Sequence, residues 1–374
     1  MPPLPPLALY VHLPWCLRKC PYCDFNSHPV EGAPPVSDYI EALLRDLEEE
    51  VAVVGPRRIH AVFIGGGTPS LFRGAEVAAL LEGIDRRAPL AAEVEITLEA
   101  NPGTADAARF HDYRSAGVNR LSLGIQSFDD EALARLGRIH DARQAHAAFE
   151  SARRAGFENI NLDLMYGLPG QRPEDAVADL RRALALGPEH LSWYQLTLEP
   201  GTPFHRRPPP LPCDDTLWAI QRAGLERLEA AGYLRYEISA FALEGRRCRH
   251  NLNYWTFGDY LGIGAGAHGK LTNARGVFRY QKPRRPRSYM AAPRREAEQA
   301  VAQAELPLEF LMNALRLVEG VDEALFTART GLPPAALEPG LSRLRRRGLL
   351  APKGIRATPR GLDFLNELLL EFHP

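Results

Sequence analysis

Strand-like apolar runs alternate with amphipathic stretches from residue 8 to residue 231, and this alternation constrains the fold more than any other feature. The strand-like runs cover residues 8–13, 60–65, 94–99, 120–125, 159–165 and 190–196. The amphipathic stretches cover residues 38–54, 75–87, 106–116, 141–155, 174–186 and 216–231. Because strands that alternate with helices form parallel sheets with right-handed crossovers, we expect an α/β fold. Six units instead of eight favour a partial (βα)6 barrel that is open on one side.

The last part of the chain predicts a separate small domain. Residues 281–298 are rich in proline and arginine, which indicates a linker between a barrel unit (1–280) and a C-terminal unit (299–374). Short helical patterns, a hairpin and a last helix follow, at residues 308–317, 322–330, 337–347, 349–358 and 359–371. We expect a winged-helix-like α+β domain. Its arginines at positions 343 and 345–347 are compatible with nucleic-acid binding, but a solvated charged face is commoner and is favoured here.

Composition restricts the classes of protein to consider. The 45 basic and 46 acidic residues give a net charge of −1, which excludes a chain-wide basic surface for nucleic acid. The first residues lack the basic and apolar stretches of a secretory signal, and no run approaches the roughly 18 apolar residues of a membrane helix. We therefore expect a cytoplasmic protein with no transmembrane segment. In that reducing compartment, clustered cysteines are more often metal ligands than disulfides.

Three of the five cysteines, Cys16, Cys20 and Cys23, lie within eight residues directly after the first predicted strand. Pro21 excludes a regular helix here, so we expect a loop that wraps its thiolates around a central object. Three thiolates can hold three corners of an iron–sulfur cube and leave one iron without a protein ligand. A zinc site completed by His12 or His28, and three unconnected thiols, are the alternatives.

Polar and glycine residues follow the other predicted strands at the same edge of the sheet. The second strand runs into the glycine–threonine segment 66–68, the third ends at Glu99, and Gln126 follows the fourth. Asp163 interrupts an apolar fifth strand, where an acid is costly unless it is paired or ligand-bound. Each feature alone has a structural explanation, such as a tight turn. Because chemistry gathers at the carboxyl ends of parallel strands, their joint placement predicts a shared ligand site.

On these residues the chain resembles the radical S-adenosylmethionine (SAM) superfamily. The superfamily loop has the spacing C-x-x-x-C-x-x-C with an aromatic residue before the last cysteine, which is Tyr22 here. The segment 66–68 matches as well, and the resemblance extends from about residue 9 to the C-terminus. Within the superfamily, the chain is similar to the branch that contains the oxygen-independent coproporphyrinogen oxidases and the HemW-type heme chaperones. The resemblance makes the zinc alternative remote.

The resemblance implies a role for each matching residue. Cys16, Cys20 and Cys23 would ligate a 4Fe-4S cluster, and SAM would chelate its open iron. The positions that match SAM contacts of the family are Tyr10, Gly66, Gly67, Thr68, Glu99, Gln126, Arg138 and Asp163. In the family, one-electron reduction of SAM yields methionine and a 5′-deoxyadenosyl radical, while the protein supplies orientation and excludes water.

Two departures from the oxidases favour the chaperones. The oxidases have a further cysteine two residues after the third, where this chain has Phe25, and a long extension before the first strand, where this chain has fewer than ten residues. The segment HNLNYW at residues 250–255 is typical of the chaperones and is linked in that family to heme. An imidazole from His250 and flat faces from Tyr254 and Trp255 would suit a heme. These residues would equally suit a brace at the mouth of the site.

Three hypotheses therefore stand. The favoured one is a heme chaperone that binds a 4Fe-4S cluster, SAM and heme and delivers heme to apo-proteins, with respiratory proteins among the expected recipients. An electron donor for the cluster and a homodimer are expected with it. The second is an oxygen-independent coproporphyrinogen III dehydrogenase or another radical SAM enzyme acting on a porphyrin. The third is a radical SAM enzyme that modifies RNA. We expect neither coproporphyrinogen oxidase activity nor a nucleic-acid partner.

Overall fold

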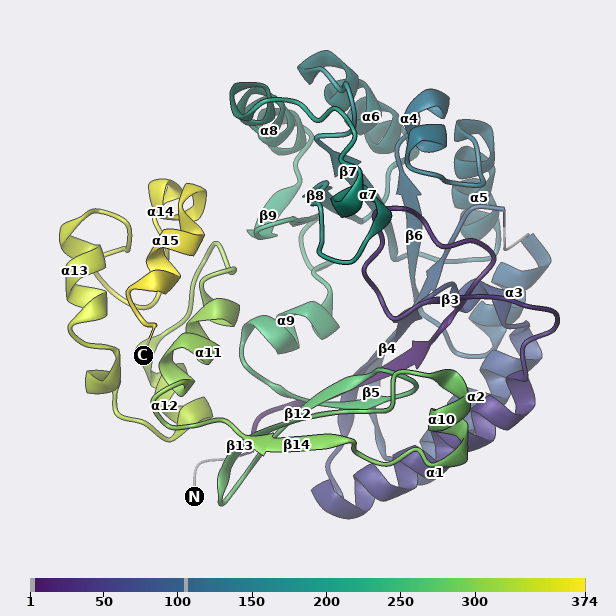
Figure 1. Cartoon of the computed structure of the whole chain (residues 1–374), viewed down its shortest axis with the longest axis horizontal. Helices are drawn as coiled ribbons and strands as arrows, with labels where there is room; N and C mark the ends of the chain where they lie inside the picture. Colours follow the sequence, from purple (N-terminus) through teal and green to yellow (C-terminus); the bar gives the residue numbers. More distant parts are fainter. Residues whose placement is uncertain (1–3, 104–106, 374) are drawn as a thin grey trace.

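Six parallel strands form the centre of a twelve-stranded sheet in the computed structural model, which describes residues 4–103 and 107–373 (Figure 1). The strand order is β14-β13-β12-β11-β1-β4-β5-β6-β7-β8-β10-β9. The central strands are β1 (Leu7–Leu13), β4 (Ile59–Gly66), β5 (Leu90–Ala100), β6 (Arg120–Gln126), β7 (Ile160–Tyr166) and β8 (His190–Gln195). They are the six predicted strands, and each pairs in parallel with the next. The predicted α/β fold is confirmed.

The helices between these strands also lie where the sequence predicts them. They are α1 (Val36–Val54), α2 (Gly74–Arg87), α3 (Ala107–Ser115), α5 (Ala142–Arg154), α6 (Pro173–Leu186) and α8 (Asp214–Ala230). Asp106, the predicted first residue of the third helix, lies outside the described residues. Local chemistry sets the helix ends: Asp141 caps α5 by accepting a hydrogen bond from the amide of Gln144 (2.7 Å), and the left-handed Gly187 ends α6. The apolar faces of these helices pack on the outside of the sheet and form its main core.

Further strands extend both edges of the sheet. On one edge, β11 (Asp259–Ile263) pairs in parallel with β1 and is followed by antiparallel β12 (His268–Asn273), β13 (Gly276–Gln281) and β14 (Ala297–Ala300). The other edge has β10 (Ala240–Ala242) and β9 (Leu234–Glu237). Short helices complete this part: η1 (Pro69–Leu71), α4 (Asp130–Arg135), α7 (Pro203–Arg206) and α9 (Arg249–Trp255). The sheet ends at β14 and β9, so it is open, as a partial barrel requires.

The segment 281–298 is wrongly predicted as a linker. It contains α10 (Pro286–Ala291) and the first residues of β14, which pairs with β13. Lys282 is fully buried and forms ion pairs with Asp46 and Glu50 of α1, and the Tyr289 hydroxyl donates to Asp46 over 2.7 Å. The proline- and arginine-rich segment is therefore an ordered part of the structure that these buried contacts hold against α1.

A small helical domain ends the chain. Its helices are α11 (Leu306–Ala314), α12 (Glu323–Thr330), η2 (Pro334–Leu337), α13 (Gly340–Arg346), α14 (Pro359–Asp363) and α15 (Leu365–Leu370). An antiparallel bridge joins Leu350 to Ala357, so the predicted hairpin is present, whereas the predicted last helix is broken at Phe364. The domain has its own apolar core, which also includes Phe257 next to α9. In Figure 1 this domain (yellow) lies at one end of the molecule.

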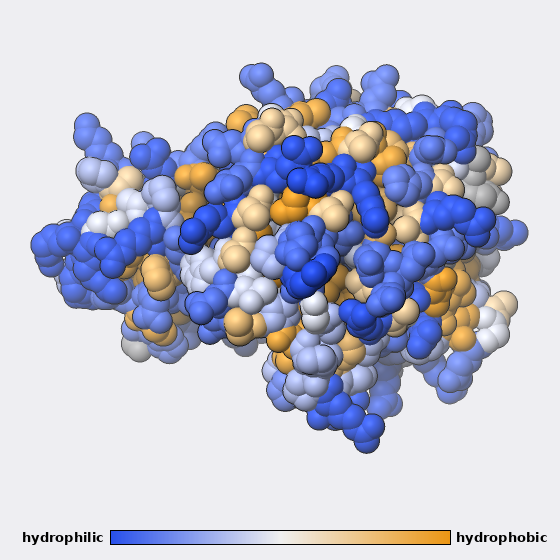
Figure 2. Space-filling view, turned by 90° about the horizontal axis from the view of Figure 1, so that it is seen from above, coloured by the Kyte–Doolittle hydropathy of each residue, from blue (hydrophilic) through white to orange (hydrophobic). Residues whose placement is uncertain are grey.

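The arginines of α13 are mostly occupied within the domain. Arg343 and Arg347 both pair with Glu371, and Arg345 pairs with Glu323. Figure 2 shows mainly hydrophilic side chains at this end of the molecule. Within the described residues, every helix is too short or too polar to cross a lipid bilayer.

Candidate functional site

The cysteine loop lies across the carboxyl ends of β1 and β4. It is shaped by two short strands, β2 (Trp15–Cys16) and β3 (His28–Pro29), which pair in parallel. The Lys19 ammonium donates to the carbonyls of Phe25 (2.9 Å) and Ser27 (3.4 Å) and so closes the loop on itself. The thiols of Cys16, Cys20 and Cys23 line one cavity, as the sequence predicts for ligands of a common object.

Arg138 connects this loop to the sheet. Its guanidinium lies 3.8 Å from the Cys20 sulfur and donates to Asn101 Oδ1 (2.6 Å) and to the carbonyl of Gly124 (2.7 Å). Gly137, which is left-handed, passes so close to Pro21 that a Cβ would lie 2.8 Å from that ring. The positive charge beside the thiols therefore comes from a residue distant in sequence, whereas Lys19 holds the loop.

The surroundings of the thiols bear on which metal group they could hold. Burial raises the pKa of Cys16 and Cys23, so these thiols keep their protons in the absence of a metal. The positive charge of a bound metal would release the protons and stabilise the thiolates. No three histidine, cysteine or carboxylate side chains converge on one metal-ion position within the described residues. His12, a candidate fourth zinc ligand, is engaged at both nitrogens: Nδ1 with the Tyr10 hydroxyl (2.9 Å) and Nε2 with the carbonyl of Asn26 (2.8 Å).

The first cavity has a volume of about 480 Å³ and opens between the cysteine loop and the carboxyl ends of the parallel strands. It brings together seven of the eight predicted SAM residues: Gly66, Gly67, Thr68, Glu99, Gln126, Arg138 and Asp163. Tyr10, the eighth, lines a neighbouring cavity instead. Five of the seven end or directly follow a central strand, as the strand-end rule expects, whereas Asp163 lies in the middle of β7 and Arg138 follows α4.

Two of the acids that line the first cavity, Glu99 and Asp163, have raised pKa values. Burial and the nearby Asp163 raise the pKa of Glu99 to about 7, although the amide of Gly66 donates to Glu99 over 3.1 Å. Burial also raises the pKa of Asp163, which accepts hydrogen bonds from Ser122 (2.9 Å) and Asn161 (2.8 Å). Neither acid forms an ion pair with a described residue. A cationic ligand such as a sulfonium or an amine would stabilise both carboxylates.

The glycines after β4 have a packing role that the sequence interpretation did not include. A Cβ at Gly67 would lie 2.5 Å from the carbonyl oxygen of Trp15, and one at Gly66 would lie 2.5 Å from the His12 ring. The amides of Gly67 and Thr68 donate to the carbonyls of Leu13 and Trp15. These glycines therefore let the cysteine loop dock on the strand end, in addition to leaving room for a ligand.

A strained residue at the end of β6 is held by a side chain that the sequence analysis did not identify. Gln126 adopts φ 71°, which is unusual for a residue other than glycine, next to a bulge in the pairing with β7. The Tyr194 hydroxyl donates to Gln126 Oε1 over 2.8 Å, and Tyr194 also lines the cavity. The alternation along β8 could have indicated Tyr194, since it lies near the carboxyl end of that strand.

A second cavity, of about 640 Å³, adjoins the first. Its aromatic lining comes from Tyr10, Phe63, Tyr254 and Tyr260, together with the ring of His250. These rings come from β1, β4, α9 and β11, and α9 contacts each of the three strands. The two cavities share the lining residues Asp24, Phe25, Gly66 and Glu99. Two of the three predicted heme residues, His250 and Tyr254, therefore lie next to the cysteine-lined cavity.

His250 is a buried, neutral imidazole. Its ring stacks on Phe63 (centroids 4.9 Å apart) and meets the Tyr254 ring edge-on (4.7 Å). Burial lowers its pKa to about 3, so it is uncharged at neutral pH. Neither ring nitrogen has a hydrogen-bond partner among the described residues, and Nδ1 is buried. An unprotonated imidazole nitrogen without a partner is a suitable ligand for a metal.

Trp255, the third predicted heme residue, is not among the lining residues of either cavity. The guanidinium of Arg316 lies over its ring at 4.3 Å, and Arg316 pairs with Glu237 (3.0 Å). The side chain therefore packs between α9 and the start of the C-terminal domain. The helix turn from Tyr254 to Trp255 explains the separation, because adjacent residues on a helix face different directions.

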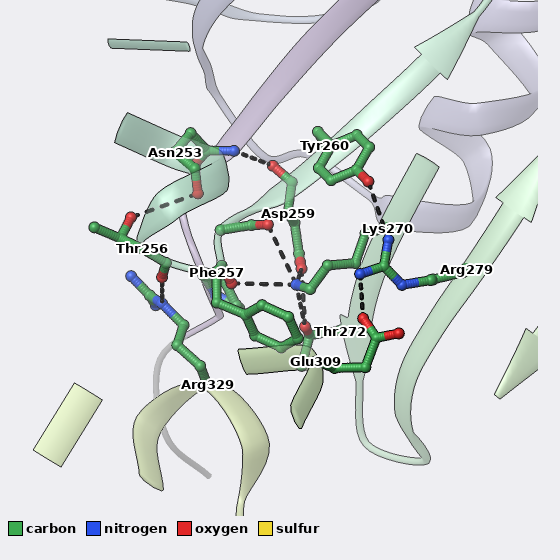
Figure 3. A network of polar contacts seen from close by, with 12 residues as sticks. Asn253, Thr256, Phe257, Asp259, Tyr260, Lys270, Thr272, Arg279, Glu309 and Arg329 are labelled. Atoms are coloured by element: carbon green, nitrogen blue, oxygen red, sulfur yellow. Dashed lines mark hydrogen bonds and ion pairs between the residues drawn. The ribbon is translucent and has the colours of Figure 1, made fainter. Parts of the chain in front are cut away.

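A polar network fastens the wall of the second cavity to the C-terminal domain (Figure 3). Arg279 of β13 pairs with Glu309 of α11 and donates to the Tyr260 hydroxyl (3.5 Å). The Tyr260 ring contacts the Tyr254 ring at 4.4 Å. In the same network, buried Lys270 pairs with Asp259 at 3.1 Å.

Comparisons with known proteins agree with this geometry. The profile of the Radical SAM superfamily matches residues 10–183, and that of the HemN C-terminal domain matches residues 301–364. The solved structure of coproporphyrinogen III oxidase (HemN) from Escherichia coli, a radical SAM enzyme, aligns with a TM-score of 0.84. The alignment covers 99% of this chain and 90% of the HemN chain at 23% sequence identity, which shows that the two proteins share a fold.

Two curated relatives show the family. The heme chaperone HemW of Escherichia coli (strain K12) is 51% identical over 369 residues, which cover 98% of both chains. The heme chaperone HemW of Bacillus subtilis (strain 168) is 34% identical over 381 residues, which again cover 98% of both. The resemblance stated from the sequence is thus confirmed: the chain belongs to the HemW heme chaperone family of the radical SAM superfamily.

Proposed function

We propose that this protein is a heme chaperone that binds a 4Fe-4S cluster, SAM and heme, and delivers heme to apo-proteins. The observation that carries the proposal is the pair of adjoining cavities, one lined by three thiols and the other by His250 among aromatic rings. The relatives named as heme chaperones support it, since the similarity covers nearly the whole chain.

Cys16, Cys20 and Cys23 would hold the cluster, which supplies one-electron chemistry when bound. Arg138, beside Cys20, would offset the negative charge of thiolates and cluster. Burial by Trp15, which is mostly covered, and by Tyr22 would limit the access of water to the thiols.

SAM would occupy the first cavity. Gly66, Gly67 and Thr68 line it beside the cysteine loop, and Gln126 faces it from β6. Glu99 and Asp163 would be relieved of the cost of their buried charge by the cationic groups of SAM. Tyr10 would act from the second cavity, where its hydroxyl holds His12.

Heme would occupy the second cavity, with His250 as a ligand to its iron and the Tyr254 ring beside the macrocycle. The neutral state of His250 supports this, because only the neutral imidazole binds a metal. Trp255 would support the cavity from behind through its contact with Arg316.

The setting of this function is also a proposal. We infer a cytoplasmic protein that receives electrons from a separate donor and forms a homodimer, with respiratory apo-proteins among its recipients. Coproporphyrinogen oxidase activity is not expected, since Phe25 stands where the oxidases have their additional cysteine. Phe25 is 59% exposed and lines both cavities.

The test is hemin titration and transfer after anaerobic reconstitution. The wild-type chain is expected to give a perturbed Soret band and to convert an added apo-protein to its heme form. His250→Ala is expected to weaken heme binding at least about tenfold through loss of the iron ligand. His111→Ala, an exposed histidine on α3, is the matched control. Absence of a Soret change in the wild type would refute the proposal, and anaerobic turnover of coproporphyrinogen would favour the oxidase.

A further inference from the structure

The second cavity has an asymmetric distribution of charge. Its acids, Asp24 and Glu99, belong to the wall that it shares with the first cavity. Four basic residues line the second cavity and not the first. Burial lowers the pKa of His12 to about 4 and of His250 to about 3. This leaves His268 and Arg284 as candidates for binding an anion. A molecule in this cavity therefore meets aromatic rings, acids on the wall shared with the first cavity, and a basic edge formed by His268 and Arg284.

Arg284 has an exposed side chain on a fixed backbone. Its carbonyl accepts a hydrogen bond from Asn26 Nδ2 (2.8 Å), and the preceding Pro283 carbonyl accepts one from the amide of Gly266 (2.9 Å). Lys282, two residues earlier, is locked by its buried ion pairs with α1. The guanidinium of Arg284 has no ion-pair or hydrogen-bond partner among the described residues, so it is free to meet an anion.

His268 stands next to Arg284 at the same edge. It begins β12 and pairs with Gln281 of β13, which also lines the cavity. Burial lowers the pKa of His268, and the positive charges of Arg284 and Arg279 lower it further. The local potential is therefore positive, and a carboxylate placed here would favour protonation of His268.

We infer that His268 and Arg284 bind the propionate carboxylates of a heme held in the second cavity. The inference rests on the proposed function and adds the residues that would bind the polar groups of the heme. Heme is a flat aromatic ring with two carboxylates on one edge, so a cavity with an aromatic lining and a basic edge matches it: Arg284 supplies a positive charge, and a carboxylate beside His268 would favour the protonated imidazole. Arginine suits a carboxylate well, because its planar guanidinium can donate two parallel hydrogen bonds. With His250 on the iron, this edge would fix the orientation of the macrocycle.

The test compares hemin with hemin dimethyl ester, whose propionates are uncharged. Wild-type chain is expected to bind hemin about tenfold more tightly than the ester, and His268→Gln with Arg284→Ala is expected to remove that preference by weakening hemin alone. Arg285→Ala is the matched control, because Arg285 is an exposed neighbour that does not line the cavity. Affinities come from Soret titration of the full-length chain.

Protoporphyrin IX separates the propionate contacts from iron ligation. This iron-free ring keeps both carboxylates, so its binding, followed by fluorescence, is expected to weaken in the double variant and to change little in His250→Ala. Equal wild-type affinity for hemin and its ester, or a double variant that binds hemin like the wild type, would overturn the inference while leaving the heme proposal intact. A wild-type chain that binds neither tetrapyrrole would refute both.

Discussion

The two cavities are built in different ways. The first takes its residues from the carboxyl ends of successive parallel strands, together with the loop that follows the first strand. The second draws on β1, β4, a short helix and an antiparallel edge that are separated by up to about two hundred and seventy residues. The first cavity can therefore be predicted from the repeated strand–helix pattern of the sequence. The second cavity depends on where the later part of the chain packs at the open side of the barrel, which this pattern does not indicate.

The largest expected effect comes from a cysteine substitution that should disable the first cavity and leave ligand binding in the second unchanged. Cys20→Ser is expected to abolish cluster assembly, because a hydroxyl replaces one of three thiolate ligands. Iron content and visible absorbance after anaerobic reconstitution measure this loss. Hemin affinity should stay within about twofold of the wild type, since His250 and its aromatic neighbours are unchanged. Cys213→Ser, at an exposed cysteine, is the control. Loss of heme binding in Cys20→Ser would show that the cavities act as one site.

Docking of the cysteine loop on β4 is tested by Gly67→Ala. The added Cβ would lie 2.5 Å from the Trp15 carbonyl oxygen, and we expect it to lower the free energy of unfolding by about 1–3 kcal/mol and to impair cluster assembly. Denaturant unfolding of the apo-protein measures the first effect. Gly187→Ala, at a left-handed glycine with open space around it, measures the backbone cost alone. Unchanged stability in Gly67→Ala would contradict the packing role.

The pKa of Glu99, on the wall that the two cavities share, predicts a pH dependence of SAM binding. Because the raised pKa of about 7 favours the protonated acid, the apo-protein loses stability as pH rises from about 4.5 to about 7. A cationic ligand prefers the ionised form, so SAM affinity should rise about tenfold between pH 6 and pH 8. Calorimetry on the reconstituted chain measures it. Glu99→Gln should bind SAM weakly, with an affinity that does not change with pH. If the SAM affinity of this variant still changed with pH, another group would be responsible for the pH dependence.

The smallest expected effect concerns the support of the second cavity. Glu309→Gln removes the partner of Arg279, which holds the Tyr260 hydroxyl. The pair is partly exposed, so we expect hemin affinity to fall by no more than about threefold and SAM affinity to stay constant. Parallel titrations of the two ligands check this. Equal losses for both would mean that the C-terminal domain supports the barrel as a whole.

The sequence predicted the barrel well because each strand and helix has its own periodic pattern. The same regularity located Glu99, Gln126 and Asp163 at one edge. Tyr194 was not predicted as a site residue, because a tyrosine in an apolar strand is equally typical of the hydrophobic core. The segment 281–298 was wrongly predicted because its fastening depends on Asp46 and Glu50, which lie more than two hundred residues earlier.

The second cavity was only partly predictable for the same reason. The segment 250–255 was recognised, but sequence spacing could not separate Trp255 from Tyr254, since the division depends on which face of α9 meets the C-terminal domain. The basic edge at His268 and Arg284 lies on either side of a hairpin, and only the pairing of β12 with β13 brings it to the cavity.

Iron-edge anomalous diffraction from crystals of the reconstituted chain with bound hemin would test the central claim most directly. The account predicts two separate iron sites, a four-iron cluster whose corners are held by Cys16, Cys20 and Cys23, and a single heme iron bonded to His250 in the aromatic cavity. Heme iron bound at any other residue, or a heme seated in the cysteine-lined cavity, would contradict it.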